Sequence, residues 1–486
     1  MAVSNFWRRW SWRKKCLLWI FLLTLPLSDP WVRGDGIGYY AYARALIVQG
    51  NLNFEADWLA GNKTFLMSRT DAPGHLNSEQ YTSTGHVDNH FTVGPSILWS
   101  PFLLFTHGTV HLWNSAGGRI PADGFSWPYT LTMALATAFY AFLGLLLSFA
   151  LARKYVSERW AFLATLGIWF ASSLPVYMYF NPSWSHALSA FVVALFLWYW
   201  DRTRVDRTAI HWFVLGLIGG LMGDVYYPNF IFFLAPAIEI VLHSWRLRSP
   251  QHPGEPRSGT LILRGVIFAA AVLLAFLPTL ATRQIIYGSP FATGYEVGPW
   301  HWGAPRLLGL LFSSDHGLFS WTPILIIAAT GLFLLPRRDR QTGGIFLACA
   351  IAFYYLIASY PDWEGISSFG NRFFISLTPL FVVGLAMFFS VCESLFHSTR
   401  GAFWRACTVT ALLIVWNLGF VFQWGTHLIS ERGPISWQEM TYNQFRVVPF
   451  AMWGEVKQYL IHRSAMLRKI EDDDAKKLEK DGSHAE

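Results

Sequence analysis

The feature that most constrains this chain is a series of about eleven apolar segments, each of a length suited to entering a membrane as a helix. They lie near residues 16–28, 129–152, 160–178, 184–200, 210–223, 226–243, 263–281, 318–336, 343–359, 373–392 and 404–424. Hydrophobic residues make up 53% of the chain and charged residues only 14%, which excludes a water-soluble fold. The sequence therefore predicts an all-α polytopic membrane protein of about 11 transmembrane helices, several of them short enough to be tilted or broken.

Lys and Arg are concentrated in alternate loops, which predicts the orientation of the chain in the membrane. Residues 8–15 are basic, and later clusters are Arg153/Lys154/Arg159, Arg202/Arg204/Arg207, Arg246/Arg248/Arg257/Arg264, Arg337/Arg338/Arg340 and Arg400/Arg405. Such loops face the cytoplasm, so we expect a cytoplasmic N-terminus. The intervening loops hold most of the acids and are predicted to be extracytoplasmic. Because the net charge of +7 is spread over many loops, nucleic acid is not an expected partner.

Two of the predicted extracytoplasmic segments are long, residues 29–128 and 282–317. Neither has the alternating strands of a separate domain, so we expect a cap of short helices and loops. Residues 92–113 are apolar but interrupted by prolines and histidines, which indicates an interfacial or re-entrant helix. We therefore divide the chain into a bundle over residues 1–424, an interfacial segment over 425–462 and a charged, disordered tail over 463–486.

The cysteines and the N-terminus add two further constraints. All four cysteines lie in or beside apolar segments, so neither an exported disulfide framework nor a CxxC metal pair is predicted. The first apolar segment follows a basic region, as in a signal peptide, but Leu27-Ser28-Asp29-Pro30 is a poor cleavage site. We interpret this segment as a retained first helix.

Four groups of residues at the predicted external face resemble motifs of one enzyme family. They are Gly34-Asp35-Gly36 to Tyr42 with Leu46 and Gly50-Asn51-Leu52, His90 to Pro101, Ser314 to Pro323, and Ser368 to Arg372. Together with the basic N-terminus and first span, they resemble the bacterial protein-mannosyltransferase-like (family 39) branch of the GT-C glycosyltransferases. The resemblance implies a GT-C-type bundle with extracytoplasmic juxtamembrane helices. It also implies inverting sugar transfer from a polyprenyl-phosphate donor at the extracytoplasmic face of the inner membrane.

The chain departs from the family pattern in three respects. Asp35 lacks the adjacent second acid found in many members, and Tyr226-Tyr227-Pro228 occupies a region where an arginine is common. The first loop contains no Asp-x-Asp, so no metal site and no cofactor are predicted, although a divalent metal is an open alternative.

Two residues are assigned to the chemistry that such a transfer requires. An acceptor hydroxyl must lose a proton while it attacks the anomeric carbon, and Asp35 is the candidate general base. The leaving lipid phosphate requires a cation, for which Arg372 is the candidate because a guanidinium fork binds phosphate oxygens in pairs. The alternatives are that Asp35 only caps a helix and that Arg372 only extends toward the interface, with Arg33 and Arg306 as rival phosphate ligands.

Further candidate substrate ligands lie in the same predicted external loops. His186 and His316 are candidates for binding sugar or phosphate, Asp88 is a possible second acid, and Glu364 follows Asp362 shortly before Arg372. Tyr39 and Tyr40 are candidates for stacking on sugar, with interface anchoring as the alternative.

The sequence thus predicts a hexosyl or pentosyl transferase of the cell envelope. Its expected partners are a polyprenyl-phosphate sugar, membrane lipids and a glycan, lipid or protein acceptor of unknown identity. The alternatives are a transporter or flippase of lipid-linked sugars and a non-catalytic partner in envelope assembly. A transporter predicts charged groups near mid-membrane and paired broken helices, whereas the charges here concentrate at segment ends.

Overall fold

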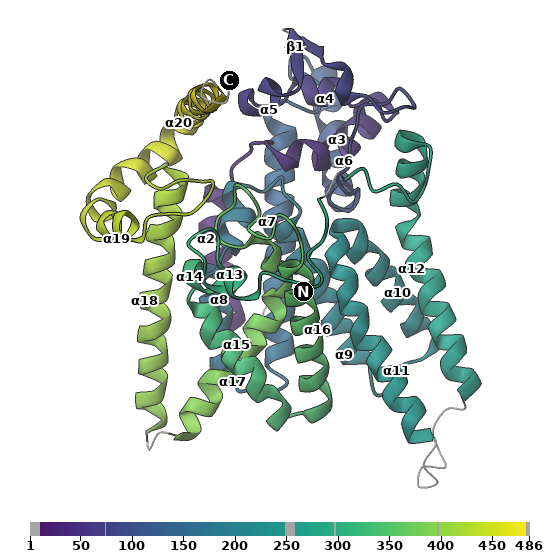
Figure 1. The fold of residues 1–486 in the computed structure, drawn as a ribbon, viewed down its shortest axis with the longest axis vertical. Coiled ribbons are helices and arrows are strands. Elements are labelled where there is room, and N and C mark those ends of the chain that lie inside the picture. The colour runs from purple at the N-terminus through teal and green to yellow at the C-terminus, as the bar shows by residue number, and fades with distance from the viewer. Residues whose placement is uncertain (1–9, 73, 248–257, 296–297, 396–397, 483–486) are drawn as a thin grey trace.

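The computed structural model describes residues 10–72, 74–247, 258–295, 298–395 and 398–482. Parts of the N-terminal and 246–264 basic clusters, and the last residues of the tail, lie outside these ranges. The described chain is an elongated bundle of roughly parallel and antiparallel helices, with a cap of shorter elements at one end (Figure 1).

Every predicted apolar segment coincides with helix in the described chain. These helices are α2 (Trp12–Thr24), α7 (Trp127–Ala152), α8 (Glu158–Ala171), α9 (His186–Thr203), α10 (Ala209–Val225), α11 (Leu234–Leu247), α12 (Ser258–Tyr287), α15 (Ile324–Leu334), α16 (Arg340–Ala358), α17 (Thr378–Leu395) and α18 (Thr399–Gly425). By length and composition, 6 helical stretches in the described residues could each cross a membrane unaided. The protein is therefore a multi-pass helical membrane protein.

Several of these helices are broken near the capped end of the bundle, as their short apolar runs predict. A π-helical turn, η4 (Val176–Phe180), follows α8 after a break at Ser172 and Ser173. Short 3₁₀ segments, η5 (Tyr227–Phe233) and η7 (Arg372–Leu377), precede α11 and α17. Irregular turns of this kind expose backbone groups and re-aim side chains, and they recur at functional sites.

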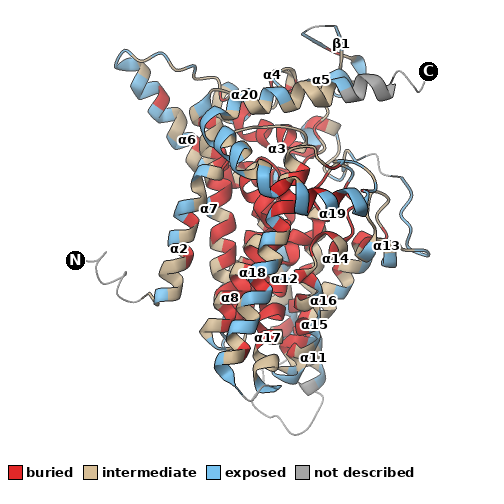
Figure 2. Ribbon diagram, turned by 90° about the vertical axis from the view of Figure 1, so that its left-hand side faces the viewer, coloured by how far each residue is buried: buried red, intermediate tan, exposed pale blue. Residues whose placement is uncertain are grey.

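Small residues allow the helices of the bundle to pack closely. In α10, a Cβ added to Gly216 or Gly220 would lie 2.4 or 2.5 Å from a carbonyl oxygen of α12. Since lipid tails are as apolar as the side chains, close van der Waals packing of this type is a main source of helix association in a membrane. Figure 2 shows the result, with buried residues along the inner faces and exposed residues on the outside.

The cap contains the short elements of the first long loop. They are α3 (Asp35–Arg44), η2 (Ala45–Gln49), α4 (Glu55–Leu59), α5 (Lys63–Met67), β1 (Thr70–Ala72), β2 (His75–Leu76), η3 (Ser78–Gln80) and α6 (Gly94–Ser115). A small second core, which includes Tyr42, Phe54 and Trp58, holds them together. The second half of α6 leaves the bundle (Figure 2) and exposes Phe105 and Trp113, as an interfacial helix would.

The remaining short helices connect or follow the long helices. Between α12 and α15 are α13 (Leu307–Phe312) and α14 (Leu318–Trp321), with η1 (Leu25–Leu27) after α2 and η6 (Leu335–Arg337) after α15. After α18 come α19 (Trp437–Arg446) and α20 (Val448–Gly482), which kinks at His462.

The structure differs from the expected disorder of residues 463–486, because α20 continues as helix to Gly482. This helix lies over the cap (Figure 1), where Arg463 donates to the carbonyls of Pro26 and Ser28 and Lys63 pairs with Asp472. Composition alone predicted an unstructured tail because it does not reveal these tertiary contacts, which favour helix in a polar segment.

Candidate functional site

Asp35 and Arg372, the two residues assigned to the chemistry, form an ion pair. The Arg372 Nη1 atom lies 3.1 Å from the Asp35 Oδ2 atom. Asp35 is the first residue of α3, and Arg372 is the first residue of η7, so the pair joins the cap to the bundle. The Asp35 side chain is 34% exposed and the Arg372 side chain 11%, which leaves the carboxylate open to a substrate.

The glycines around Asp35 fit α3 closely against the α8–α9 connection. Gly34 has a φ of +53°, a conformation that favours glycine, and a Cβ on Gly36 would lie 2.0 Å from the Ser183 Oγ atom. The α8–α9 connection also holds this turn, because the Trp184 indole donates to the carbonyl of Arg33 at 3.0 Å. The position of Asp35 is therefore set by residues 181–184.

Arg372 retains hydrogen-bonding capacity beyond its contact with Asp35. Its guanidinium lies over the Trp184 ring at 4.4 Å and near the Phe373 ring at 5.5 Å. In the described part of the chain its Nε–H is buried without a hydrogen-bond partner. A guanidinium has five N–H donors in a planar fork, so this side chain can bind an anion while it stays beside Asp35.

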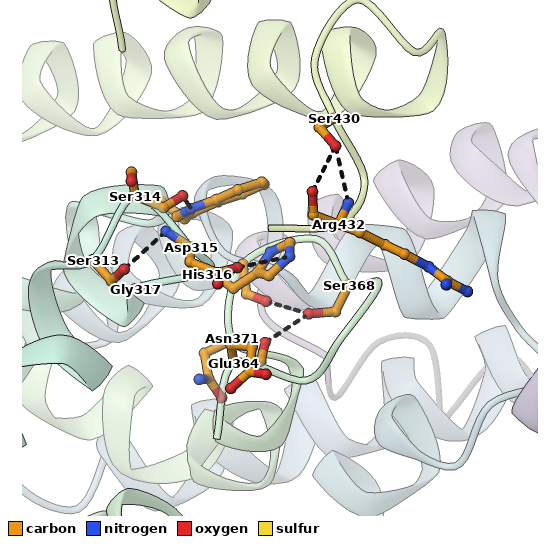
Figure 3. Close-up of polar contacts among 12 residues, drawn as sticks. Ser313, Ser314, Asp315, His316, Gly317, Glu364, Ser368, Asn371, Ser430 and Arg432 are labelled. Atoms are coloured by element: carbon orange, nitrogen blue, oxygen red, sulfur yellow. Dashed lines mark hydrogen bonds and ion pairs between the residues drawn. The ribbon is translucent and has the colours of Figure 1, made fainter. Parts of the chain in front are cut away.

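Three loops meet at one place, and we call this region the loop junction: residues 313–317, 362–371 and 427–435 (Figure 3). It lies next to Arg372, because a Cβ added to Gly365 would be 3.5 Å from the Arg372 Nε atom. Among the described residues, the three non-glycine residues with positive φ all lie here: His316, Ile366 and His427. Ser367 and Arg432 form a β-bridge that connects two of the loops. Left-handed conformations are costly for such residues and often occur at functional sites.

Polar atoms without hydrogen-bond partners also gather at the loop junction. Among the described residues they include the Oδ1 of Asp315 and the Oδ1 of Asn371. His316 Nε2 lies 3.7 Å from Asp315 Oδ1, which is too far for a hydrogen bond. Burial, with a smaller contribution from the charge of Arg372, lowers the pKa of His316 to about 4, so the ring is neutral at pH 7.

The acids of the loop junction respond to the same desolvation. Burial raises the pKa of Asp315 and of Glu364, and the charges of Asp315 and Asp362 raise that of Glu364 further. Glu364 and His316, both predicted to bind substrate, therefore belong to one polar region next to Arg372. His186 lies on the other side of Arg372, buried among the rings of Tyr177, Tyr226 and Phe373.

The two predicted stacking tyrosines have different surroundings. Tyr39 follows Asp35 by one helical turn, and burial together with the Asp35 charge raises the pKa of its hydroxyl. Tyr40 is buried against Trp99 and donates to the carbonyl of Gly124 at 2.7 Å, so it packs α3 and does not face Asp35. The Tyr40 ring therefore lies on a different face of α3 from Asp35, because helix geometry turns consecutive residues to different faces.

Asp88 lies in the cap and interacts with residues other than the central pair. It accepts from the Tyr287 hydroxyl and lies 3.8 Å from His90. Burial works to raise its pKa, but the interactions with His90 and Tyr287 outweigh it and lower the pKa. Asp88 is thus an ionised anchor of the cap, not a neighbour of Asp35.

The rival phosphate ligands have other surroundings. The Arg33 guanidinium donates twice to Asn181 Oδ1, at 2.9 and 2.7 Å, whereas Arg306 is exposed before α13. One group of His, Asp and Glu residues in the described chain could hold a metal ion, His427/Glu431/Asp474. It contains none of the predicted site residues.

Two important residues were missed from the sequence. Trp184 contacts Arg372 and the carbonyl of Arg33, two residues before Asp35, and its only sequence signal was its place near His186 in a Pro- and Ser-rich turn. Arg283, buried in α12, donates to the carbonyls of Asn89, His90 and Phe91. It could have been noted as the lone arginine at the external end of its span.

Comparisons with known proteins give similarity in structure only. No protein-family model matches the chain, and no curated protein matches it. Two solved structures of an oligosaccharyltransferase from Archaeoglobus fulgidus are similar. One is AglB in complex with an inhibitory peptide and a dolichol-phosphate, with 12% identity, a TM-score of 0.45, and coverage of 90% of this chain and 63% of that one.

The other is the apo form, with 13% identity, a TM-score of 0.48, and coverage of 91% of this chain and 64% of that chain. ArnT from Cupriavidus metallidurans bound to undecaprenyl phosphate has 13% identity and a TM-score of 0.43, with coverage of 85% and 71%. The chain spans less than two thirds of the length of the A. fulgidus protein.

Proposed function

We propose that this protein is an inverting glycosyltransferase that moves a sugar from a polyprenyl-phosphate-linked donor to an acceptor hydroxyl or amine. The observation that carries the proposal is the pairing of Asp35 and Arg372 at 3.1 Å, on segments that are far apart in the chain. It joins an accessible carboxylate to a cation with unused donors, the two groups that the chemistry needs.

In the proposed reaction Asp35 is the general base. It takes the proton from the acceptor hydroxyl while the acceptor oxygen forms a bond to the anomeric carbon. The bond from that carbon to the phosphate oxygen breaks, and its electron pair leaves with the lipid phosphate. Since one displacement occurs, the anomeric configuration inverts. The reaction needs no cofactor, because the chain supplies both the base and the cation.

Arg372 is proposed to bind the phosphate from the donor complex through to the leaving group. The ion pair holds the two groups side by side before substrate binds. An incoming phosphate would share the guanidinium with Asp35. Glu364, His316 and Tyr39 are proposed to contact the substrate, whereas His186 is proposed to support Arg372 from the buried side.

The proposed site faces the extracytoplasmic side of the inner membrane. The basic loops lie at the end of the bundle away from the cap (Figure 1), where Lys154 pairs with Asp201 and Arg159 with Glu393. By the positive-inside rule that end is cytoplasmic, so the cap, the Asp35–Arg372 pair and α20 are extracytoplasmic.

Substituting Asp35→Asn tests the base. The amide keeps the size of the side chain but cannot accept the proton, so transfer by the purified protein in nanodiscs should fall about a hundredfold to ten-thousandfold. The control is Asp71→Asn, an exposed acid of β1, which should leave the rate unchanged. Full transfer by Asp35→Asn would refute the assignment of Asp35 as the base. If wild type flipped lipid-linked sugars but transferred none, the transporter alternative would be favoured.

Substituting Arg372→Gln tests the cation. We expect a higher KM for the donor lipid and weaker binding of polyprenyl phosphate itself, whereas Arg306→Gln, at an exposed position of the same face, should change neither. If Arg306→Gln weakened phosphate binding and Arg372→Gln did not, the phosphate would have to be assigned to Arg306 instead of Arg372.

A further inference from the structure

A line of aromatic rings extends from the surface of the protein to Arg372. The rings of Trp302 and Trp300 are stacked, with centroids 4.9 Å apart and an angle of 5° between planes. Trp300 lies 5.3 Å from Tyr360, Tyr360 lies 5.9 Å from Phe373, and Phe373 lies 5.5 Å from the Arg372 guanidinium. We call Trp302, Trp300 and Tyr360 the aromatic platform.

The outer rings of the platform are accessible to solutes. Trp302 is 48% exposed and Trp300 is 36% exposed, although indole rings normally bury most of their surface. Two parallel, exposed indoles next to a candidate active site form a flat apolar surface of the kind that binds ligands.

The platform is held rigidly, in contrast to a loop that only rests on lipid. The backbone N–H of His301 donates to the Ser359 carbonyl at 2.8 Å, and the Tyr355 hydroxyl donates to the Trp302 carbonyl at 2.6 Å. The backbone of Arg306 donates to the Ala358 carbonyl at 2.7 Å. Because α16 fixes this loop at both ends, the rings lose little conformational entropy when a ligand binds.

Polar groups lie at the inner end of the platform, where Tyr360 precedes two acids in the chain. Burial raises the pKa of Tyr360 to about 12, and the charge of Asp362 raises it while the charge of Arg372 lowers it. The charge of Asp35 also raises the pKa of this hydroxyl, so Tyr360 interacts electrostatically with both members of the proposed catalytic pair. Asp362 and Glu364 supply carboxylate oxygens that accept hydrogen bonds from hydroxyl groups.

We propose that the aromatic platform binds the acceptor, and that the acceptor is a saccharide. This inference rests on the proposed function and names the substrate class that it left open. A sugar ring offers a face of C–H bonds that packs on the electron-rich face of an indole, and hydroxyls at its edge that reach nearby carboxylates. The platform binds such a ring from the aqueous side and directs its next residue toward Asp35.

A tryptophan pair that only anchored the protein in the membrane would need neither a rigidly held loop nor nearby carboxylates. Interfacial tryptophans sit at the headgroup level with their polar edge in water, and lipid tails have no hydroxyls for Asp362 or Glu364. The exposed Trp453 of α20, at 79% exposure, provides the matched control for that role, because it lies in an apolar stretch remote from Arg372 in sequence.

The experiment measures saccharide binding directly, in the full chain in nanodiscs, by saturation-transfer NMR with methyl glycosides of common hexoses and with N-acetylglucosamine. We expect at least one glycoside to bind, Trp302→Ala to weaken its binding about tenfold, and Trp302→Phe to restore most of it. Trp453→Ala should bind as wild type does.

Three results would overturn the proposal: no glycoside binds to wild type, Trp302→Ala binds as well as wild type, or Trp453→Ala loses as much as Trp302→Ala. The Asp35→Asn variant separates this inference from the proposed function. It should bind the glycoside normally while transfer is lost; if transfer survives in Asp35→Asn but the platform still binds sugar, only the catalytic assignment fails.

Discussion

The guanidinium of Arg372 lies over the ring of Trp184, 4.4 Å from its centre, and that indole also donates to the backbone just before Asp35. One side chain thus contacts Arg372 and the turn that leads into Asp35. A cation over an indole face is attracted by the electron-rich ring, and the attraction grows when water is excluded. Trp184 is therefore a positioning residue that sets the distance between base and cation.

We expect Trp184→Ala to lower kcat/KM about tenfold or more, because a desolvated cation–π contact contributes up to about 2 kcal/mol. Trp184→Phe keeps a ring beneath Arg372 and should recover most of the activity. The measurement is steady-state transfer, with KM for the donor lipid read separately from kcat. A purely structural role for Trp184 would instead lower melting temperature in both variants and leave the kinetics of the folded fraction unchanged.

A second prediction concerns Gly36, which packs on Ser183. A methyl group added there would lie 2.0 Å from the Ser183 Oγ atom and 2.5 Å from its Cβ. Gly36→Ala should therefore push α3 away and destabilise the fold by about 1–3 kcal/mol, with loss of activity because Asp35 moves with the helix.

The matched control is Gly108→Ala, in the exposed second half of α6, where an added Cβ meets nothing within 4 Å. Alanine favours helix over glycine by about 1 kcal/mol, so this variant should be neutral or slightly more stable. The double variant Gly36→Ala/Ser183→Gly should recover part of the lost stability. Equal melting temperatures for the Gly36→Ala variant and wild type would contradict the packing argument.

The helices of the bundle could be predicted from the sequence, but the buried polar contacts could not. Apolar runs and loop charges depend on local composition, and they located both the spans and the face shared by Asp35 and Arg372. The buried ion pair between Arg44 and Asp57, in contrast, joins side chains that only the folding of the cap brings together. Trp184 and Arg283 were missed for the same reason, since their partners are distant in sequence.

The third prediction follows from the pKa of His316, which burial lowers from 6.5 to about 4. The unfolded chain binds this proton more tightly than the folded chain does. Stability from the neutral ring is therefore complete above about pH 6.5 and is lost as pH falls toward 4. In His316→Asn, which cannot titrate, this part of the pH dependence should disappear.

The measurement compares melting temperatures of wild type and His316→Asn between pH 7.5 and 4.5. The comparison isolates His316 because Asp29 and Asp57, whose pKa values burial raises to about 6, titrate in both proteins with the opposite sign. We expect the melting temperature of wild type to fall relative to that of His316→Asn as the pH is lowered. Parallel curves would show that the ring is not buried as a neutral group.

The last prediction concerns the contact between α20 and the start of the cap. Arg463 donates to the Pro26 and Ser28 carbonyls, each at 2.6 Å, and the Tyr459 hydroxyl donates to the Leu27 carbonyl at 2.9 Å. Because these carbonyls end the first span, the contacts hold the C-terminal helix against the cap.

Arg463→Ala should free α20 and increase its cleavage by chymotrypsin several-fold, while the bundle keeps its melting temperature. Arg468→Ala, whose Nε–H bonds only within its own helix, is the control and should be cleaved as slowly as wild type. Equal cleavage of the Arg463→Ala variant and wild type would mean that α20 is held by other contacts.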